Sequence, residues 1–277
     1  MGTHLLEIEN LVLDFESKFA TKRILKNISF YLNEGEILAI VGQSGSGKTV
    51  TLHTIMGLLP TTAKIVDGEI LYKDKKLINL SKKDMNKIRG KEIGMIFQNA
   101  INHLNPTMKV GKQIADIMVR HLGISWKVSK IKTLEILNNY QFENTEIIYN
   151  KYPHELSGGQ CQRIMLAMVT ACKPKIILAD EPTSGLDFVN QNTIMSELEK
   201  TRAEDKSSII VVTHDINVAK RFADRIAIFH NGMVVETGTV KQVIDSPMHP
   251  YTKHLISAIP DNRTIKKGQI RILNEMW

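Results

Sequence analysis

The sequence predicts an α/β fold built around a parallel sheet, and three observations support this fold class. Continuous apolar runs at 175–180 and 207–213 are typical of strands that are buried on both faces. Residues 1–97 instead hold short strand-like runs separated by polar turns. Residues 98–156 carry helical spacing and no strand signal. We therefore expect a parallel-sheet core, an N-terminal antiparallel β subdomain and an inserted helical subdomain.

The first region provides most of the short strands. Three strand-like runs are bounded by polar turns: "HLLEIENLVLDF" (4–15), "ILKNISFYL" (24–32) and "DGEILYK" (67–73). A fourth run, "EILAIV" (36–41), leads directly into a glycine-rich loop. This arrangement predicts a partly antiparallel sheet that leans on the parallel core.

Helices and strands alternate in the rest of the chain. Helical spacing in the insert is found at 110–123 and 129–140. Beyond residue 157, the order is a helix at 159–172, a strand at 175–180, a helix at 192–204, a strand at 207–213 and further alternation. Amphipathic helices between buried strands are expected to cover both faces of the sheet.

The composition is that of a globular protein with a sizeable core. The 277 residues are 43% hydrophobic and 23% charged, and no apolar run approaches the roughly 18 to 20 residues that span a bilayer. The start of the chain matches neither a signal peptide nor a myristoylation site. We therefore expect the protein to remain in the cytoplasm.

The net charge bears on the class of partner, and the two cysteines bear on the redox compartment. The formal net charge is +7, and the lysines are scattered without interleaved aromatic residues. This pattern indicates a solvated basic surface, with a surface facing anionic lipid or a nucleotide as the alternative, and it predicts no nucleic-acid partner. Cys161 and Cys172 are too widely spaced on one predicted helix for a disulfide, so we expect free thiols of a reducing compartment.

A phosphate-binding loop is the most specific chemical signal. The segment "GQSGSGKT" (42–49) matches G-x-x-x-x-G-K-[ST] between a predicted strand and a predicted helix. In such a loop, the backbone amides and the helix N-terminus face the phosphates. Lys48 is expected to neutralise the β and γ oxygens, and the Thr49 hydroxyl to bind Mg²⁺. The core should therefore be that of a P-loop nucleoside triphosphatase.

Two adjacent carboxylates follow the strand at 175–180. Asp180 ends this strand, and a carboxylate at such a position in a P-loop protein is placed to hold Mg²⁺ through water. The side chain of Glu181 should point in another direction because successive residues of a strand alternate. We interpret Asp180 as the metal-binding acid and Glu181 as the general base that polarises the attacking water.

Three further polar residues are candidates for the same site. His214 follows the strand at 207–213, where an imidazole can bond the γ-phosphate or hold the water. Gln98 closes a strand-like run where the insert begins, where its amide can contact Mg²⁺ or water. His53 lies one turn into the P-loop helix with no partner in view, and we interpret it as structural.

A second glycine-containing turn completes a recognisable series. The elements, in chain order, are the P-loop at 42–49, Gln98, "LSGGQ" (156–160), "IILADE" (176–181), "SGLD" (184–187) and His214. Together they resemble the ATP-binding cassette of a transporter: its Walker A, Q-loop, signature, Walker B, D-loop and switch histidine. The resemblance implies an ATPase that uses ATP and Mg²⁺, and it covers nearly the whole chain.

The resemblance also implies which residues bind the nucleotide. Two cassettes are expected to pair head to tail, so that the signature of one chain serves the ATP held by the P-loop of the other. An aromatic residue near the N-terminus is expected to stack on adenine; Phe15 fits best, with Phe19 as the alternative. The expected nucleotide-binding residues are Phe15, Gly42, Ser44, Gly45, Ser46, Gly47, Lys48, Thr49, Val50, Ser157, Gly158, Gly159 and Gln160. The expected catalytic residues are Glu181, His214, Lys48 and Gln98, and the expected metal ligands are Thr49, Gln98 and Asp180.

Further motifs resemble one branch of this family. They are "FQNAINHLNP" (97–106), "YPHELSGG" (152–159), "AMVTACKPKIILADEPTSGLD" (167–187) and "SPMHPYTKHLISAIP" (246–260). They are similar to the ATPase subunits of oligopeptide, dipeptide and nickel importers. The resemblance implies a cassette domain over 1–260, with its helical insert at 98–156, and a short C-terminal segment over 246–277. Some relatives extend into a longer tail that carries a cysteine cluster. The shorter tail without cysteines predicts no iron–sulfur site here and slightly favours nickel or metal-chelate cargo.

Importers of this branch imply partners that the chain itself does not contain. We expect a second and different ATPase subunit, two transmembrane permease subunits and an extracytoplasmic substrate-binding protein, with this chain peripheral on the cytoplasmic face of the membrane. A soluble cassette ATPase of DNA repair or translation is the main alternative. It would need a long coiled coil before the signature or two cassettes in one chain, and the sequence has neither. A kinase-like P-loop enzyme leaves the signature and 246–260 unexplained.

Overall fold

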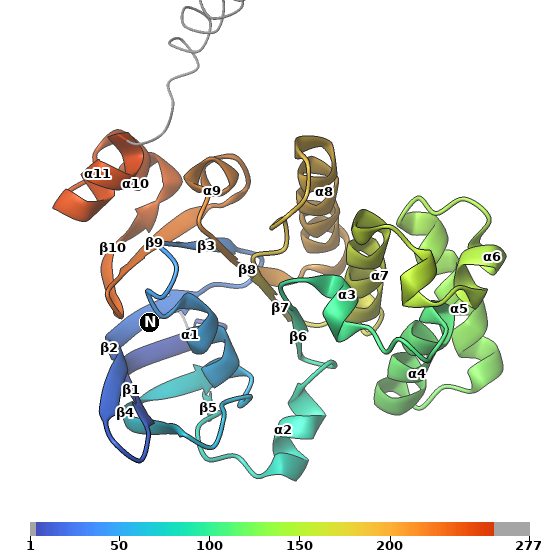
Figure 1. The fold of residues 1–277 in the computed structure, drawn as a ribbon, viewed down its shortest axis with the longest axis horizontal. Coiled ribbons are helices and arrows are strands. Elements are labelled where there is room, and N and C mark those ends of the chain that lie inside the picture. Colours follow the sequence, from blue (N-terminus) through green and yellow to red (C-terminus); the bar gives the residue numbers. More distant parts are fainter. Residues whose placement is uncertain (1–3, 258–277) are drawn as a thin grey trace, which may run out of the picture.

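The protein folds around two sheets and a lobe of helices (Figure 1). The computed structural model describes residues 4–257, which include all the site residues named above. Within this part of the chain, no helix combines the length and the apolar character needed to cross a membrane. Of the segment predicted over 246–277, only the residues up to Ser257 fall within it.

The N-terminal sheet is antiparallel, as predicted. It is 4-stranded, with the order β2-β1-β4-β5. Leu6 of β1 pairs with Leu32 of β2 on one side and with Tyr72 of β4 on the other, and all three are buried. The strands are β1 (Leu6–Glu16), β2 (Thr21–Leu32), β4 (Ala63–Tyr72) and β5 (Lys75–Lys76).

The second sheet is the predicted parallel core. It is 6-stranded, with the order β10-β9-β3-β8-β7-β6, and only β10 runs antiparallel to its neighbour. Every residue of β3, β7 and β8 is buried, which explains their continuous apolar sequences. The strands are β3 (Ile37–Val41), β6 (Ile93–Ile96), β7 (Ile176–Asp180), β8 (Ser208–Thr213), β9 (Arg225–His230) and β10 (Met233–Thr239).

The register of the parallel strands brings the predicted site together. Val41 at the end of β3 pairs with Thr213 at the end of β8, and Asp180 at the end of β7 pairs with Val212. The P-loop, Glu181 and His214 therefore all leave the sheet at one edge, the edge formed by the carboxyl ends of the strands.

The helices cover the sheet and form a separate lobe. Figure 1 shows α4, α5 and α6 gathered at one end of the molecule beside α7. One core cluster joins Ile114 of α4 and Leu137 of α5 to Ile164 of α7 and Ile177 of β7, so the lobe packs on the sheet through α7. The helices are α1 (Lys48–Ile55), α2 (Lys82–Ile88), α3 (Ala100–His103), α4 (Val110–Leu122), α5 (Trp126–Asn139), α6 (Thr145–Asn150), the 3₁₀ helix η1 (Pro153–Glu155), α7 (Gly158–Thr170), α8 (Phe188–Asp205), α9 (Ile216–Phe222), α10 (Val240–Asp245) and α11 (Pro250–Ser257).

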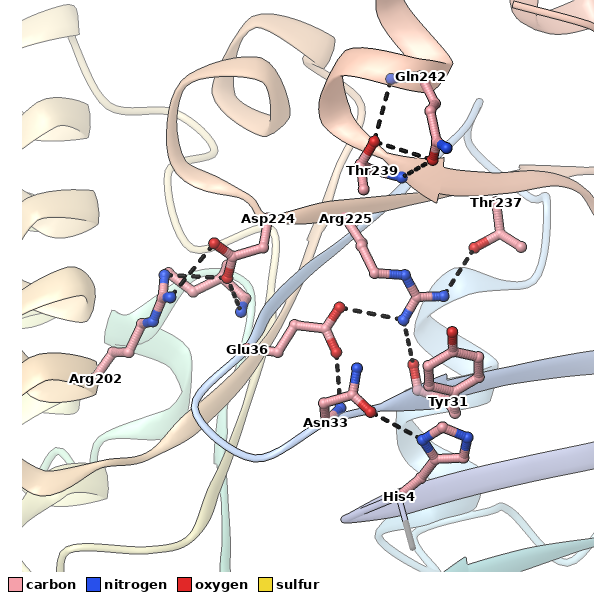
Figure 2. Close-up of polar contacts among 11 residues, drawn as sticks. His4, Tyr31, Asn33, Glu36, Arg202, Asp224, Arg225, Thr237, Thr239 and Gln242 are labelled. Carbon is pink, nitrogen blue, oxygen red and sulfur yellow. Dashed lines mark hydrogen bonds and ion pairs between the residues drawn. The ribbon is translucent and has the colours of Figure 1, made fainter. Parts of the chain in front are cut away.

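A buried ion pair joins the amino ends of two core strands. Arg225, the first residue of β9, contacts the carboxylate of Glu36 just before β3 at 3.1 Å, and both side chains are largely buried. The guanidinium also lies 4.0 Å from the ring centre of Tyr31 in β2, and the second oxygen of Glu36 accepts a hydrogen bond from the Asn33 amide. Figure 2 shows this network beside a more exposed pair, Arg202 with Asp224. The network ties the antiparallel sheet to the core.

Loss of Arg225 should therefore destabilise the fold. An Arg225→Ala variant leaves the Glu36 carboxylate buried without its cation, which should cost about 3 kcal/mol of unfolding free energy. Urea denaturation of the purified chain measures this change. The matched control is Arg202→Ala, whose more exposed pair should be worth less than about 1 kcal/mol. Equal losses in the two variants would contradict the role given to Arg225.

Candidate functional site: a phosphate-binding loop with a carboxylate beside it

The P-loop connects β3 to α1, and at two of its positions the structure has room only for glycine. Gly47 caps α1 with φ 103°, and a Cβ there would lie 2.7 Å from the Leu25 side chain. A Cβ on Gly42 would lie 2.1 Å from the carbonyl oxygen of Phe229 in β9. The loop backbone therefore packs closely against neighbouring strands. Its amides lie next to the N-terminus of α1. Ser44 and Gly45 are exposed in the loop, and Val50 is half-buried in α1.

Lys48 is buried inside the loop and bonded to its backbone. Its ammonium group donates to the carbonyl oxygens of Gly42 at 2.7 Å and Gln43 at 2.8 Å. Burial lowers the pKa of Lys48, against the attraction of Glu181 and Asp180. The hydroxyl of Ser46 is also buried and has no hydrogen-bond partner. A bound phosphate would add anionic acceptor atoms to this loop, so the loop fits a phosphate group.

Thr49 and Asp180 form the pair predicted to hold the metal. The Thr49 hydroxyl donates to the Asp180 carboxylate at 3.0 Å. Asp180 is buried, and this burial raises its pKa even though the hydrogen bond from Thr49 lowers it. A cation at this point would favour the ionised carboxylate, and Mg²⁺ is commonly held by one carboxylate, a hydroxyl, phosphate oxygens and water. The pair therefore fits Mg²⁺.

Glu181 is contacted by residues from the ends of two other strands. One carboxylate oxygen accepts a hydrogen bond from the Gln98 amide at 3.0 Å, and the other lies 3.4 Å from Nδ1 of His214. The His214 side chain is 64% exposed, whereas that of Glu181 is 19% exposed. The structure thus brings Gln98, Glu181 and His214 together. The described contact of the Gln98 side chain is with Glu181, and not with Thr49 or Asp180.

The different directions of Asp180 and Glu181 have a reason beyond strand alternation. Glu181 lies just after β7 and has φ 45°, a left-handed conformation that residues other than glycine seldom adopt. Its amide still donates to the Val212 carbonyl of β8 at 3.0 Å. Left-handed backbone at a non-glycine residue costs free energy and is frequently found at functional sites. The turn sends the Glu181 carboxylate to Gln98 and His214, while Asp180 stays with Thr49.

The two candidate adenine-stacking residues lie in different surroundings. Phe15 is half-buried in β1 and packs against the core cluster to which strands of both sheets contribute. Phe19 lies in the turn between β1 and β2 and is 97% exposed. Which ring meets adenine stays a prediction.

The signature turn forms the N-terminal cap of α7. The Ser157 hydroxyl accepts from the Gln160 amide at 3.3 Å, and the Gln160 side chain accepts from the Ser157 amide at 2.9 Å. Ser157 and Gly158 are exposed, while Gly159 and Gln160 are half-buried. In Figure 1, strands of the core sheet separate α1 from α7. The start of α7 is exposed at Ser157 and Gly158, and it belongs to a helix that lies across the core strands from the P-loop helix of the same chain.

Some contacts of the site were not foreseen in the sequence. The buried amide of Gln162 in α7 donates to the Pro182 carbonyl at 2.8 Å, which links the signature helix to the segment after Glu181. Burial raises the pKa of Asp180, and the electrostatic effect of His53 partly opposes this rise, so His53 has a charged neighbour that the sequence did not indicate. Neither residue shows a motif of its own. Cys161 and Cys172 are free, as predicted, and both are buried; α7 ends at Thr170, so Cys172 lies just after the helix that was expected to hold both.

Comparisons with known proteins agree with this geometry. A family model described as "ABC transporter" matches residues 25–184, and one described as "Oligopeptide/dipeptide transporter, C-terminal region" matches residues 235–276. The chain is similar to the oligopeptide transport ATP-binding protein OppD of Bacillus subtilis (strain 168), with 43% identity over 259 residues, 93% of this chain and 72% of that protein. It is also similar to the dipeptide transport ATP-binding protein DppD of Lactococcus lactis subsp. cremoris (strain MG1363), with 41% identity over 256 residues, 92% of this chain and 73% of that protein. A dimeric post-hydrolysis structure of the ATP-binding cassette MJ0796 bound to ADP and Pi has a TM-score of 0.76 and 32% identity, covering 85% of this chain and 98% of that one.

Proposed function

Because the chain belongs to the ATP-binding cassette transporter family, we propose that it is the ATP-hydrolysing subunit of an importer for oligopeptides or dipeptides. The observation that carries the catalytic part is the position of Glu181, held between Gln98 and His214 next to the P-loop. The peptide cargo is supported by the names of the similar proteins and by the match of the C-terminal region. These findings favour peptides over the nickel cargo that was the alternative.

The proposed chemistry uses the residues at the strand ends. The P-loop amides and Lys48 bind the phosphates, and Thr49 and Asp180 hold Mg²⁺, which would screen the phosphate charge. Glu181 accepts the proton of the attacking water as it approaches the γ-phosphate. His214 and Gln98 orient the Glu181 carboxylate and the water.

The second phosphate-binding turn acts in a partner cassette. Ser157 and the N-terminus of α7 are open and remote from the P-loop of their own chain, so they are best used on ATP held by a second ATPase subunit. Two cassettes that face head to tail then bury two nucleotides. ATP closes this dimer, and hydrolysis followed by release opens it.

An apolar groove beside Gln98 supports a permease contact. The groove lies between the sheet and the helical lobe, and its lining includes Met95, Phe97, Leu104, Ile117 and Met168. The Phe97 ring stacks on the ring of His103 in α3, with 4.5 Å between ring centres. Phe97 directly precedes Gln98 in the chain. A permease helix seated here would move Phe97, and with it the amide that contacts Glu181. The chain would thus sit peripherally on the cytoplasmic face of the membrane, with two permeases and an extracytoplasmic binding protein.

A Gln98→Ala variant tests this coupling in the assembled importer. In reconstituted vesicles that carry the permeases and the binding protein, peptide should stimulate ATP hydrolysis by the unaltered complex. The variant should lose at least about fivefold of that stimulation while its ATP affinity stays close to normal. The control is Asn102→Ala, an exposed amide on α3 that makes no described side-chain hydrogen bond.

Two outcomes would contradict the proposal at different points. Equal stimulation of the variant and the unaltered complex by peptide would remove Gln98 from the coupling path. Failure of peptide to stimulate the unaltered complex, with hydrolysis intact, would overturn the peptide cargo and return the nickel alternative.

A further inference from the structure

The motif His249–Pro250–Tyr251 is built as a rigid start of α11. The carboxylate of Glu236 in β10 accepts hydrogen bonds from the amides of Met248 at 2.8 Å and His249 at 3.0 Å. Burial of Glu236 opposes its ionisation, but hydrogen bonds that include these two outweigh it and lower its pKa. Nδ1 of His249 accepts from the Tyr251 amide at 3.1 Å, as a helix cap does, and Pro250 occupies the first helical position. The first two residues of the motif therefore fix where the third one points.

The side chain of Tyr251 reaches the P-loop. Its hydroxyl oxygen accepts a hydrogen bond from the backbone amide of Gln43 at 3.2 Å. Its ring stacks on His230, which ends β9, with 3.9 Å between ring centres. Gln43 and Tyr251 are 208 residues apart in the chain. The ring contact and the capped helix hold the hydroxyl at this point of the loop.

The peptide group that Tyr251 contacts is the one that also binds the catalytic lysine. The carbonyl oxygen of Gly42 accepts from Lys48, and the amide of Gln43 donates to Tyr251. These two atoms belong to a single trans peptide, in which C=O and N–H point in opposite directions. Lys48 therefore holds the inner side of this peptide plane, and Tyr251 holds the outer side.

The turn between β9 and β10 supports the other end of the loop. The Gly232 amide donates to the Ser46 carbonyl at 3.1 Å, and the Gly232 carbonyl accepts from the Lys26 amide at 2.7 Å. The loop is thus held at Ser46 by this turn and at Gln43 by Tyr251. Without the hydroxyl of Tyr251, the Gly42–Gln43 peptide would keep its hydrogen bond to Lys48 but lose the one on its other side, so its orientation would be held less firmly.

We propose that Tyr251 is a positioning residue for ATP binding, through which the C-terminal motif sets the nucleotide affinity of the P-loop. The ligand is the triphosphate of ATP, and Tyr251 acts on it only through the backbone of Gly42 and Gln43. This inference goes beyond the proposed function and rests on ATP binding at the loop, with no assumption about cargo or permeases. The motif at 249–251 lies in the segment that resembles this branch of the family. Its last residue, Tyr251, would thus have a role in nucleotide binding.

The test replaces Tyr251 by Phe, which keeps the ring on His230 and removes only the hydroxyl. Isothermal titration of the full chain with ATP and Mg²⁺ should show a dissociation constant about two- to tenfold higher, as expected for one lost hydrogen bond. The thermal midpoint without nucleotide should stay unchanged, because the packing is retained. The matched control is Tyr31→Phe, since Tyr31 also stacks on a histidine, at 3.8 Å, and its hydroxyl makes no hydrogen bond among the described residues (Figure 2).

A spectroscopic measurement separates positioning from a general loss of structure. In ¹⁵N-labelled protein without nucleotide, Tyr251→Phe should shift the amide proton of Gln43 toward weaker hydrogen bonding, while Tyr31→Phe should leave it in place. An ATP affinity equal to that of the unaltered chain, or a tighter one, would overturn the proposal. So would an unmoved Gln43 resonance. Absence of ATP binding by the unaltered chain would instead overturn the proposed function itself.

Discussion

A Glu181→Gln variant should bind ATP with nearly normal affinity and hydrolyse it at least about 10²-fold more slowly. The amide keeps the size of the side chain between Gln98 and His214 but cannot accept a proton from water. The P-loop contacts of Lys48 do not involve Glu181 directly, so binding should survive. Single-turnover hydrolysis in the assembled complex measures the loss.

Two further measurements make the result specific. With ATP, the Glu181→Gln chain should accumulate as a closed cassette dimer in size-exclusion chromatography, because hydrolysis no longer opens it. Lys48→Ala, in contrast, should lose ATP binding as well as hydrolysis, since its charge screens the phosphates in both the bound and the reacting state. Normal turnover by the Glu181→Gln complex would remove Glu181 as the base.

A Ser157→Arg variant should abolish hydrolysis of the ATP held by the partner cassette. Ser157 is exposed at the start of α7, and an arginine there would occupy the space of the γ-phosphate and block closure of the dimer. The variant's own ATP affinity should remain near normal, because its P-loop lies elsewhere. ATP binding to the isolated chain and hydrolysis by the complex measure the two effects separately.

The control for Ser157→Arg must account for the lost helix cap. Ser125 caps α5 with an equivalent hydrogen bond, which its hydroxyl accepts from the Val128 amide at 3.4 Å. Ser125→Arg should therefore have a similar cost in stability, about 1 kcal/mol, with no effect on hydrolysis. A loss of ATP binding in Ser157→Arg as severe as in Lys48→Ala would mean that the signature serves its own P-loop, contrary to the two-chain proposal.

Mixing variants distinguishes a pair of identical cassettes from a pair of different ones. If two copies of this chain pair, mixing Lys48→Ala with Ser157→Arg should restore part of the activity, because one combined site is intact. If the partner is a different ATPase, as the resemblance to importers of this branch implies, the two substitutions damage opposite sites of the complex and mixing restores nothing.

Local patterns were sufficient to predict the parallel core and the residues at its edge. Strands such as β7 and β8 are buried throughout, so their sequences are continuously apolar and their ends are unambiguous. Parallel strands place their carboxyl ends at one edge of the sheet. The sequence alone was therefore enough to predict that Asp180 and His214 lie near the P-loop. The roles given to these residues stay predictions.

Other features depend on contacts that no local pattern encodes. The pair Glu36–Arg225 joins residues 189 positions apart, and Tyr251 reaches the P-loop across 208 positions. Nothing near these residues in the chain specifies their partners. The helix α2 is different, because its signal was present: Ser81 accepts from the Asp84 amide at 3.1 Å, and a serine followed three residues later by an acid is a common start of a helix. The prediction of short strands and turns for residues 1–97 does not include this helix.

The two ends of the core strands differ in function: one holds a stabilising ion pair and the other holds the nucleotide site. The ion pair of Arg225 with Glu36 lies where β3 and β9 begin, and the nucleotide residues lie where β3, β7 and β8 end. Substitutions at the first edge should change the tolerance of the protein to heat without altering its turnover, and those at the second should do the reverse. An evolving lineage could therefore adapt to a hotter habitat by replacing residues around Arg225, while the machinery for ATP is passed on unaltered.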